Sequence, residues 1–254
     1  MYNLNFINDE DLFNHIKNTV EKYRFTVNLK QFNKNLIDPI KMTFDSKIYH
    51  KNIKEIIDLE CIRQIDKTAS NHIGYFHQNI FKYIYHKDTK QSNWEVPREG
   101  FDIINEKEKI FVEMKNKHNT MNASSSQKTY IKMLDTINKI PNSTCMLVEV
   151  IAKHSQNIPW IITLDKQKIK NEHIRRVSID KFYEIVTGEK TAFKELVEKI
   201  PIVLDDVIKD LKENPIKNTV FEELKKFDEN ILKSLYLLSF KKYEGFEELD
   251  IKLN

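Results

Sequence analysis

A chain of 254 residues, 40% of them hydrophobic and 31% charged, has the composition of a globular protein with a substantial core. No apolar run approaches the roughly 20 residues that a membrane-spanning helix needs. The N-terminus carries acids where a secretory signal carries bases, which predicts a cytoplasmic protein with no membrane partner. The net charge of +3 does not by itself indicate a nucleic-acid partner, but residues 201–254 hold 12 acids and 9 lysines, which leaves +6 on residues 1–200.

Apolar residues recur at helical spacing through the first third of the chain. This spacing predicts helices over residues 9–23, 47–66 and 70–86, with Ser70 as the N-cap of the third. Short β-prone stretches follow at residues 93–96, 101–105 and 110–115. Cys61 and Cys145 have no metal-type spacing, so we expect buried free thiols.

The middle of the chain alternates helix and strand. We expect a helix over residues 124–139, strands at 144–151 and 160–164, a short strand at 174–177, and a helix from near Ser178 to Gly188. A long helix between two strands is a βαβ crossover, so residues 110–115 and 144–151 should pair in parallel. The prediction is an α/β fold, with a small mixed sheet flanked by helices and additional N- and C-terminal helices. We predict one domain over residues 1–254, divided into an N-terminal helical part (1–69), a core (70–190) and a C-terminal helical part (191–254).

The stretch GFDIINEKEKIFVEMKNKHN, residues 100–119, has the pattern of a charged hairpin. If a four-residue loop joins its strands, Asn105 pairs with Ile110 and Asp102 lies opposite Glu113. Strand alternation then places Lys115 on the face of Glu113. The opposite face, directed to the core, is predicted to hold Phe101, Ile103, Ile110, Val112 and Met114.

Two facing carboxylates repel each other, and a divalent cation removes that cost. Asp102 and Glu113, with the backbone carbonyl of Met114, form an oxygen-rich partial shell that suits Mg²⁺ and leaves room for water and a phosphate oxygen. Lys115 can orient a water and stabilise charge on the phosphate, as phosphodiester hydrolysis requires. The alternative is a solvated hairpin whose charges only prevent edge-to-edge aggregation.

Three segments together resemble a known family: NHIGYFHQNIFKYI, WEVPREGFDI and IFVEMKNKHNTMNASSSQKTYIKML. They are similar to the PD-(D/E)XK nuclease superfamily, and within it to bacterial type II restriction endonucleases that cut GGNCC-type sites. The resemblance implies a restriction-endonuclease-like core, one or two Mg²⁺ ions per active site, Asp102 and Glu113 as metal ligands and Lys115 as the catalytic lysine. The proline that often precedes the first acid is replaced by Phe101. Where related enzymes place an acid on the preceding helix, this chain has His77 and Gln78, which leaves Gln78 to position a water.

Polar and basic residues after the hairpin are candidates for contact with double-stranded DNA. Amide, lysine and imidazole groups suit base edges or phosphates, and a helix N-terminus suits a phosphate. The guanidinium group of arginine suits phosphate. The alternative for the segment after the hairpin is a solvated loop, and the alternative for the two arginines is a surface cluster without a role. The candidates are Asn116, Lys117, His118, Asn119, Asn122, Ser124, Lys128, Arg175 and Arg176.

The hypothesis that follows is a Mg²⁺-dependent type II restriction endonuclease in a bacterial cytoplasm. A palindromic site has a two-fold axis, so we expect a homodimer in which each subunit cuts one strand. Such a system also predicts a cognate DNA methyltransferase. The alternatives are a structure-specific repair or recombination nuclease of the same superfamily and a non-catalytic DNA-binding module.

Overall fold

The computed structural model describes residues 1–164, 166–209, 216–246, 249 and 251. The chain separates into two compact units. The core unit comprises Met1–Glu21 and Ile73–Lys212, and the helical unit comprises Lys22–His72 and Glu213–Asn254. This grouping differs from the expected divisions at residues 69 and 190, because both the first 21 residues and the helix after residue 190 belong to the core unit.

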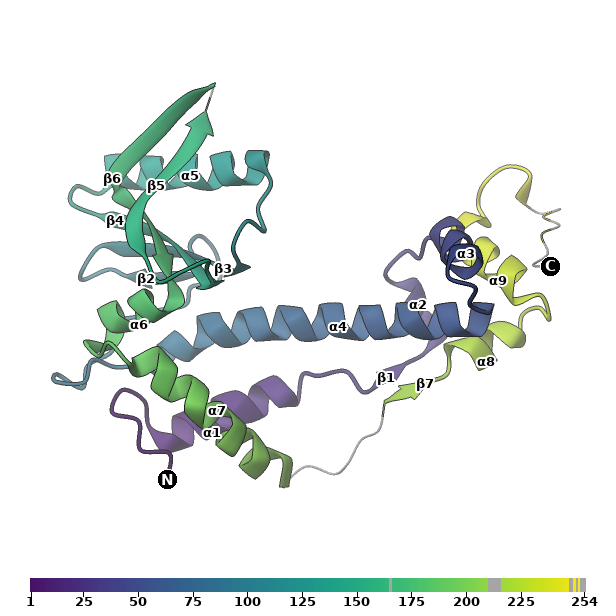
Figure 1. Cartoon of the computed structure of the whole chain (residues 1–254), viewed down its shortest axis with the longest axis horizontal. Helices are drawn as coiled ribbons and strands as arrows, with labels where there is room; N and C mark the ends of the chain where they lie inside the picture. The colour runs from purple at the N-terminus through teal and green to yellow at the C-terminus, as the bar shows by residue number, and fades with distance from the viewer. Residues whose placement is uncertain (165, 210–215, 247–248, 250, 252–254) are drawn as a thin grey trace. The chain divides into compact units, whose positions relative to one another are not determined.

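The core unit contains a five-stranded mixed sheet in the order β2-β3-β4-β6-β5 (Figure 1). β3, β4 and β6 are parallel, whereas β2 and β5 pair antiparallel at the two edges. The strands are β2 (Ile103–Asn105), β3 (Ile110–Lys117), β4 (Thr144–Ile151), β5 (Asn157–Leu164) and β6 (Gln167–Ser178). Helix α5 (Ala123–Lys139) connects β3 to β4, which confirms the predicted crossover and parallel pairing. The mixed α/β fold is the one that the resemblance implies.

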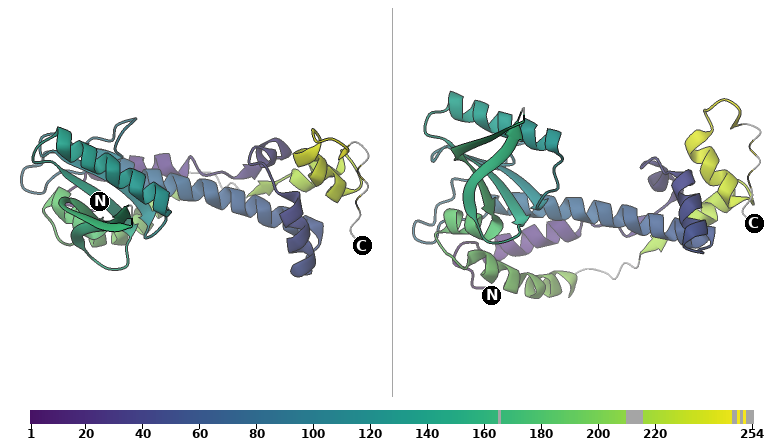
Figure 2. Two further views of the ribbon diagram at one scale, coloured as in Figure 1. Left: turned by 90° about the horizontal axis from the view of Figure 1, so that it is seen from above. Right: turned by 45° about the horizontal axis from the view of Figure 1, so that its top comes forward.

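Helices cover both faces of this sheet (Figures 1 and 2). On one face α5 places Tyr130 and Met133 against Cys145 and Leu147 of β4. On the other face, α1 (Asp9–Val20), α6 (Ile179–Thr187), α7 (Ala192–Lys209) and the short helix η1 (Ile80–Lys82) share a core with Val112 and Val148. The hairpin strand β3 is therefore held between two hydrophobic layers. Both cysteines, Cys61 and Cys145, are buried and free, as predicted.

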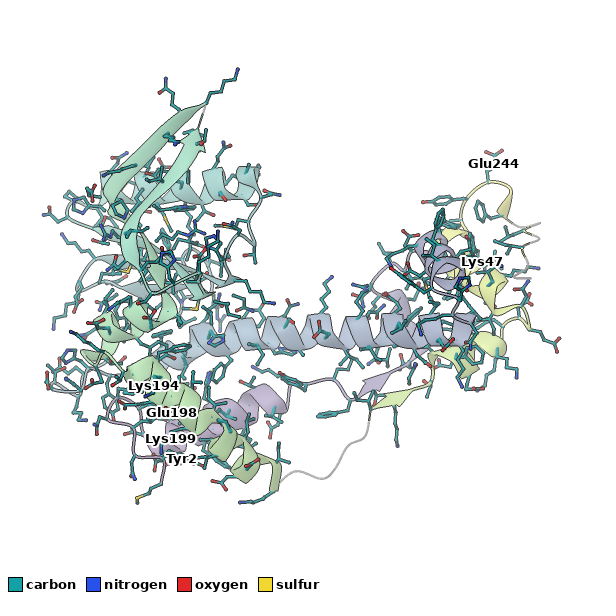
Figure 3. All side chains as sticks on the ribbon, viewed as in Figure 1. Tyr2, Lys47, Lys194, Glu198, Lys199 and Glu244 are labelled. Atoms are coloured by element: carbon teal, nitrogen blue, oxygen red, sulfur yellow. The ribbon has the colours of Figure 1, made fainter. Side chains whose placement is uncertain are left out.

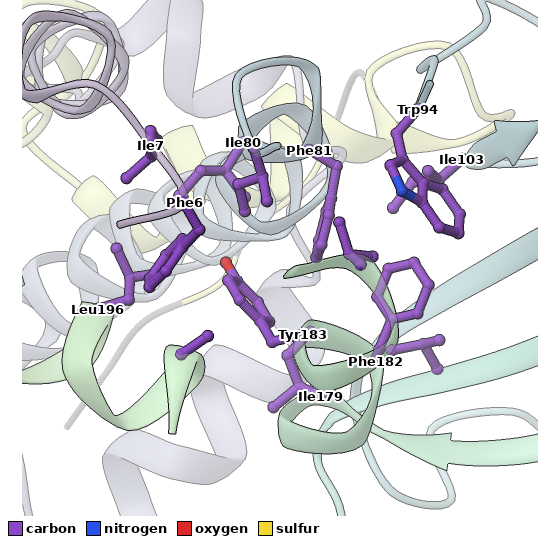
Figure 4. Packing of buried hydrophobic residues seen from close by; sticks show 14 of the residues in the cluster. Phe6, Ile7, Ile80, Phe81, Trp94, Ile103, Ile179, Phe182, Tyr183 and Leu196 are labelled. Atoms are coloured by element: carbon purple, nitrogen blue, oxygen red, sulfur yellow. The ribbon is translucent and has the colours of Figure 1, made fainter. Parts of the chain in front are cut away.

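Aromatic rings fill the centre of the second layer (Figure 4). The ring of Phe81 lies 4.8 Å from that of Phe182 and 5.0 Å from that of Tyr183, measured between centroids. Charged side chains point the other way: Lys194 and Glu198 form an exposed ion pair of 3.6 Å along α7 (Figure 3). This division is the expected one for a helix with one buried face.

Several expected elements differ from the structure. The expected strand at residues 93–96 is only an isolated bridge between Glu95 and Ile104. The predicted helices at 47–66 and 70–86 are one continuous helix, α4 (Ile53–Asn79), followed by η1, so Ser70 lies within a helix and is no N-cap. No glycine or proline separates the two segments, and the Thr68 hydroxyl donates to the carbonyl of Gln64 at 2.9 Å, which accommodates a polar residue inside the helix. The predicted short strand at 174–177 is the end of a strand of 12 residues, β6, whose first half is largely exposed and therefore lacks an apolar pattern.

The helical unit has its own small core. Val27, Phe32, Ile57, Leu224 and Leu235 are completely buried there. Its elements are β1 (Thr26–Val27), α2 (Leu29–Asn33), α3 (Pro39–Ile48), the first part of α4, β7 (Lys217–Asn218), α8 (Val220–Lys225) and α9 (Ile231–Phe240). These helices confirm the additional N- and C-terminal helices. Among the residues that the structure describes, no helix is long and apolar enough to cross a membrane.

Candidate active site

The hairpin has the predicted register. Asn105 pairs with Ile110 across a four-residue loop, and the Asn105 side chain accepts a hydrogen bond of 3.0 Å from the backbone N–H of Glu108. β2 begins only at Ile103, so Asp102 lies just outside the ladder. Its Oδ2 accepts a hydrogen bond of 2.8 Å from the backbone N–H of Met114. The first acid is thus held against β3 by its own carboxylate.

The expected core-directed face needs one correction. Ile103, Ile110, Val112 and Met114 are buried together as predicted, but Phe101 packs on the opposite side of the sheet, with its ring centroid 5.4 Å from that of Phe111. Alternation holds only within a strand, and residues 101 and 102 form a bend that follows Gly100, whose φ of +94° is in the left-handed region. The bend carries Phe101 to the other face.

Two lysines approach the second acid. Glu113 lies on β3 with 12% of its side chain exposed, and its Oε2 is 3.5 Å from Nζ of Lys115. Its Oε1 forms an ion pair with Lys132 of α5. Sequence reasoning missed Lys132, because a lysine at the border of an amphipathic helix is ordinary and its partner is 19 residues away. The structure thus brings Glu113 and Lys115 together, as predicted, and adds a second cation.

The two carboxylates influence each other. Burial raises the pKa of Asp102, and the negative charge of Glu113 raises it further, while the hydrogen bond from Met114 and the charges of Lys115 and Lys132 oppose this shift. A carboxyl whose charged form is disfavoured in this way is stabilised by a nearby cation.

The residues present fit a divalent metal ion. In an extended strand the N–H and C=O of one residue project to the same side, so the carbonyl of Met114 faces the side of β3 on which Asp102 lies. Two carboxylates and one carbonyl are hard oxygen donors and leave positions for water. No group of three or more His, Cys, Asp and Glu residues suited to a metal occurs within the described ranges, so any site here depends on this small donor set.

A pocket of about 330 Å³ opens beside Asp102. Gln78, near the C-terminal end of α4, lines it together with Asp102, Lys82 and Arg98. The pocket therefore places Gln78 next to the first acid, where a water could be held, and adds two basic residues that were not predicted as site residues.

The segment after β3 presents several of the predicted DNA-contacting groups. Lys117 and Asn119 are exposed, and so are Ser124 and Lys128 on α5. Asn122 is the N-cap of α5, because its side chain accepts a hydrogen bond of 2.8 Å from the backbone N–H of Ser125. Asn116 lies against α4, where a Cβ added at Gly74 would come within 3.5 Å of its amide nitrogen.

A second carboxylate cluster lies on the same face of the sheet and consists of Glu149, Arg176, His118 and Asn119; we call it the arginine cluster. Glu149 is next to Lys115 in the parallel register and is only 2% exposed. Its Oε2 is 3.0 Å from Nδ1 of His118 and 3.1 Å from Nε of Arg176, and Nη2 of Arg176 also donates to Oδ1 of Asn119 at 3.2 Å. Burial would raise the pKa of Glu149, but the hydrogen bonds from Arg176 and His118 hold it below its usual range.

Two of the predicted DNA contacts, Arg175 and Arg176, form hydrogen bonds within the protein. Arg176 is engaged by Glu149, and Arg175 donates from Nε to Oδ1 of Asn157 at 2.9 Å. Glu149 was not singled out from the sequence, although a single acid within the apolar run of residues 144–151 is a signal that a buried partner exists.

Comparison with known proteins assigns the family. Residues 4–209 match the model of the family described as Eco47II restriction endonuclease. The chain is 35% identical over 216 residues to the type II restriction enzyme Sau96I of Staphylococcus aureus, covering 81% of each chain. It is 27% identical over 219 residues to the type II restriction enzyme Eco47II of Escherichia coli, covering 81% of this chain and 88% of that one.

These matches confirm the resemblance to restriction endonucleases and favour that function over a repair nuclease or a non-catalytic module. They extend across nearly all of the core unit, which contains the hairpin and α5. The chain therefore belongs to the Eco47II restriction endonuclease family and is a type II restriction endonuclease, a hydrolase that acts on DNA.

Proposed function

We propose that the enzyme hydrolyses phosphodiester bonds of double-stranded DNA with Mg²⁺ held by Asp102, Glu113 and the carbonyl of Met114. The observation that carries this proposal is the convergence of Asp102, Glu113 and Lys115 at one end of the hairpin. Mg²⁺ at this place supplies charge neutralisation for the phosphate and lowers the pKa of a bound water.

The protein side chains have distinct roles in this reaction. Asp102 is fixed by the N–H of Met114, so its position does not depend on the metal. Lys115, with 33% of its side chain exposed, can reach a phosphate oxygen and stabilise the charge that develops there. Gln78 holds a water in the pocket beside Asp102.

DNA recognition falls to the segment that follows the catalytic strand. Lys117, Asn119, Ser124 and Lys128 are exposed between the end of β3 and the first turns of α5, which suits contact with phosphates and base edges. We assign Asn116, His118, Asn122, Arg175 and Arg176 to the same surface, with Arg176 acting through Asn119, to whose side chain it donates a hydrogen bond. The recognised site is a short palindrome of the GGNCC type, cut by a homodimer and protected in the host by a cognate methyltransferase.

Digestion of a sequenced plasmid tests the proposed reaction. Incubation with Mg²⁺ should give discrete fragments, and EDTA should abolish them. Sequencing of the fragment ends identifies the site and the stagger, and a plasmid methylated at that site should resist cleavage. A smear of products, or intact plasmid with every divalent cation, would contradict the proposal.

The lysine variants separate catalysis from binding. Lys115→Ala should lower the cleavage rate by about 10²–10³-fold, the usual range for removing one group that stabilises the charge developing in the transition state. DNA binding should be largely retained, as measured by gel shift. Lys107→Ala, in the exposed loop of the same hairpin, is the matched control and should cleave normally. Equal losses in both variants would remove Lys115 from the site.

The proposed homodimer is tested by measuring the mass of the protein in solution. Sedimentation of the purified protein should give twice the mass of the 30.4 kDa chain. A monomer that stays monomeric on a palindromic duplex would contradict the two-fold arrangement.

A further inference from the structure

We propose that Lys132 is a built-in counter-ion that neutralises Glu113 while the metal site is empty and withdraws when the cation binds. This inference rests on the proposed metal site. It concerns a residue on α5, outside the hairpin that supplies the metal ligands.

All three partners of Lys132 belong to the two segments that form the site. Its ammonium group forms an ion pair with Oε1 of Glu113 and donates a hydrogen bond of 2.8 Å to the carbonyl of Gly100. It also lies 4.0 Å above the centroid of the Phe101 ring. Lys132 therefore connects the bend before Asp102 to the strand that carries Glu113.

The lysines are distributed unevenly between the two carboxylates, which indicates that one of them can be exchanged for a metal ion. Glu113 has two lysines, Lys115 and Lys132, whereas no lysine, arginine or histidine within the described ranges forms an ion pair with Asp102. The two lysines balance the two acids, so the pair of carboxylates can persist without a metal. A divalent cation bound to Glu113 and Asp102 would add two positive charges, so the two carboxylates would no longer need the lysines for neutrality.

Lys132 is the lysine that can leave. Lys132 forms its ion pair with Oε1 of Glu113, while Lys115 stands 3.5 Å from Oε2, so Lys132 is the lysine in closer contact with the carboxylate that a cation would share. The Lys132 side chain is 37% exposed, and a flexible lysine stem lets a displaced ammonium enter water at little cost.

Calorimetric titration with Mg²⁺ in the absence of DNA tests the exchange. Lys132→Met keeps the aliphatic stem and removes the charge, so Mg²⁺ affinity should rise by roughly two- to fivefold, the scale of a partly exposed ion pair. Lys132→Arg keeps the charge and should bind like the wild type. Lys128→Met removes the same charge one turn earlier, from an exposed position that forms no salt bridge with another described residue, and should leave the affinity unchanged.

Thermal unfolding provides a second measurement that does not depend on activity. In EDTA, Lys132→Met should melt below the wild type, because Glu113 loses a partner beside Asp102. At saturating Mg²⁺ the difference should close, because the metal replaces the lost charge and stabilises the folded state by binding it. A difference of the same size in both conditions would overturn the proposal.

Glu113→Gln distinguishes this inference from the metal site itself. If Glu113→Gln loses Mg²⁺ binding while Lys132→Met binds no more tightly than the wild type, the counter-ion role is wrong and the metal site stands. If Glu113→Gln binds Mg²⁺ like the wild type, both are wrong. An equal gain of affinity in Lys128→Met would show a general charge effect and would also overturn the role of Lys132.

Discussion

Two carboxylate clusters lie side by side on one face of the sheet and are built differently. In the hairpin, Glu113 is paired with two flexible lysines whose side chains are 33% and 37% exposed. In the arginine cluster, Glu149 is 2% exposed and is held by the rigid guanidinium fork of Arg176 and by His118. The lysines of the first carboxylate are partly exposed and can move away from it into water, whereas the partners of the second cannot leave without stranding a buried charge.

The difference in partners indicates that Glu113 belongs to a reactive site, whereas Glu149 belongs to a structural support. A lysine is a point charge on a mobile stem, so it suits a position that a metal or phosphate shares with it. An arginine that makes several hydrogen bonds to one buried carboxylate suits a permanent support. The following variants test this separation.

The largest effect is expected at Asp102. Asp102→Asn should lower cleavage by at least about 100-fold, since a metal ion contributes several kcal/mol to catalysis. Its free energy of unfolding should stay the same or rise, because burial and Glu113 already raise the pKa of this carboxyl and so disfavour its charged form in the folded enzyme. Cleavage assays and urea unfolding measure the two properties, and a fall in both together would make Asp102 a structural residue.

The opposite result is expected for the arginine cluster. Arg176→Ala leaves Glu149 buried without its main partner and should lower the free energy of unfolding by about 3–5 kcal/mol. Arg175→Ala, whose side chain hydrogen-bonds to Asn157 at the edge strand, is the matched control and should lose far less. If Arg176→Ala unfolds like the wild type but binds DNA weakly, Arg176 contacts DNA directly.

Acid should destabilise the two clusters unequally. The pKa of Glu149 is held below its ordinary value of 4.5 in the folded enzyme, so its stabilising effect is present above that pH and is lost as the pH falls through the lower folded value. Glu149→Gln should therefore show a smaller loss of unfolding free energy between neutral and acidic pH than the wild type. An unchanged acid dependence would mean that Glu149 is not the group concerned.

The smallest effect is expected at Gly100. With φ at +94° and no atom within 4 Å of an added Cβ, Gly100→Ala should cost only the backbone strain, about 1 kcal/mol of stability. Because the bend also positions Phe101 and Asp102, cleavage should fall as well. Gly245→Ala, at φ +82° and also without close neighbours, should carry similar strain and leave cleavage unchanged.

The hairpin was predictable because its information is local. A glycine-free four-residue loop and strict alternation determine which residues of β3 face the core, and the Asn105–Ile110 pair followed from them. Prediction failed where alternation stops: Asp102 and Phe101 lie in a bend, and their positions depend on Gly100 and on the N–H of Met114.

Contacts between residues far apart in the sequence could not be predicted either. Lys132 and Glu149 each meet their partners across 19 or more residues, and neither pairing has a local sequence signature. The exposed start of β6 was also missed, because its pairing with β5 lies in backbone hydrogen bonds and not in apolar residues. The family resemblance identified the chemistry but contained no information on these contacts.

Helix α5 links the two ends of the site mechanically. Asn122, which caps its first turn, and Lys132 belong to one rigid rod that rises about 1.5 Å per residue. The exposed residues Ser124 and Lys128, which we assign to DNA contact, and the ammonium group that is paired with Glu113 therefore belong to the same helix. We expect DNA bound at the proposed surface and the charge around Glu113 to be coupled through this helix.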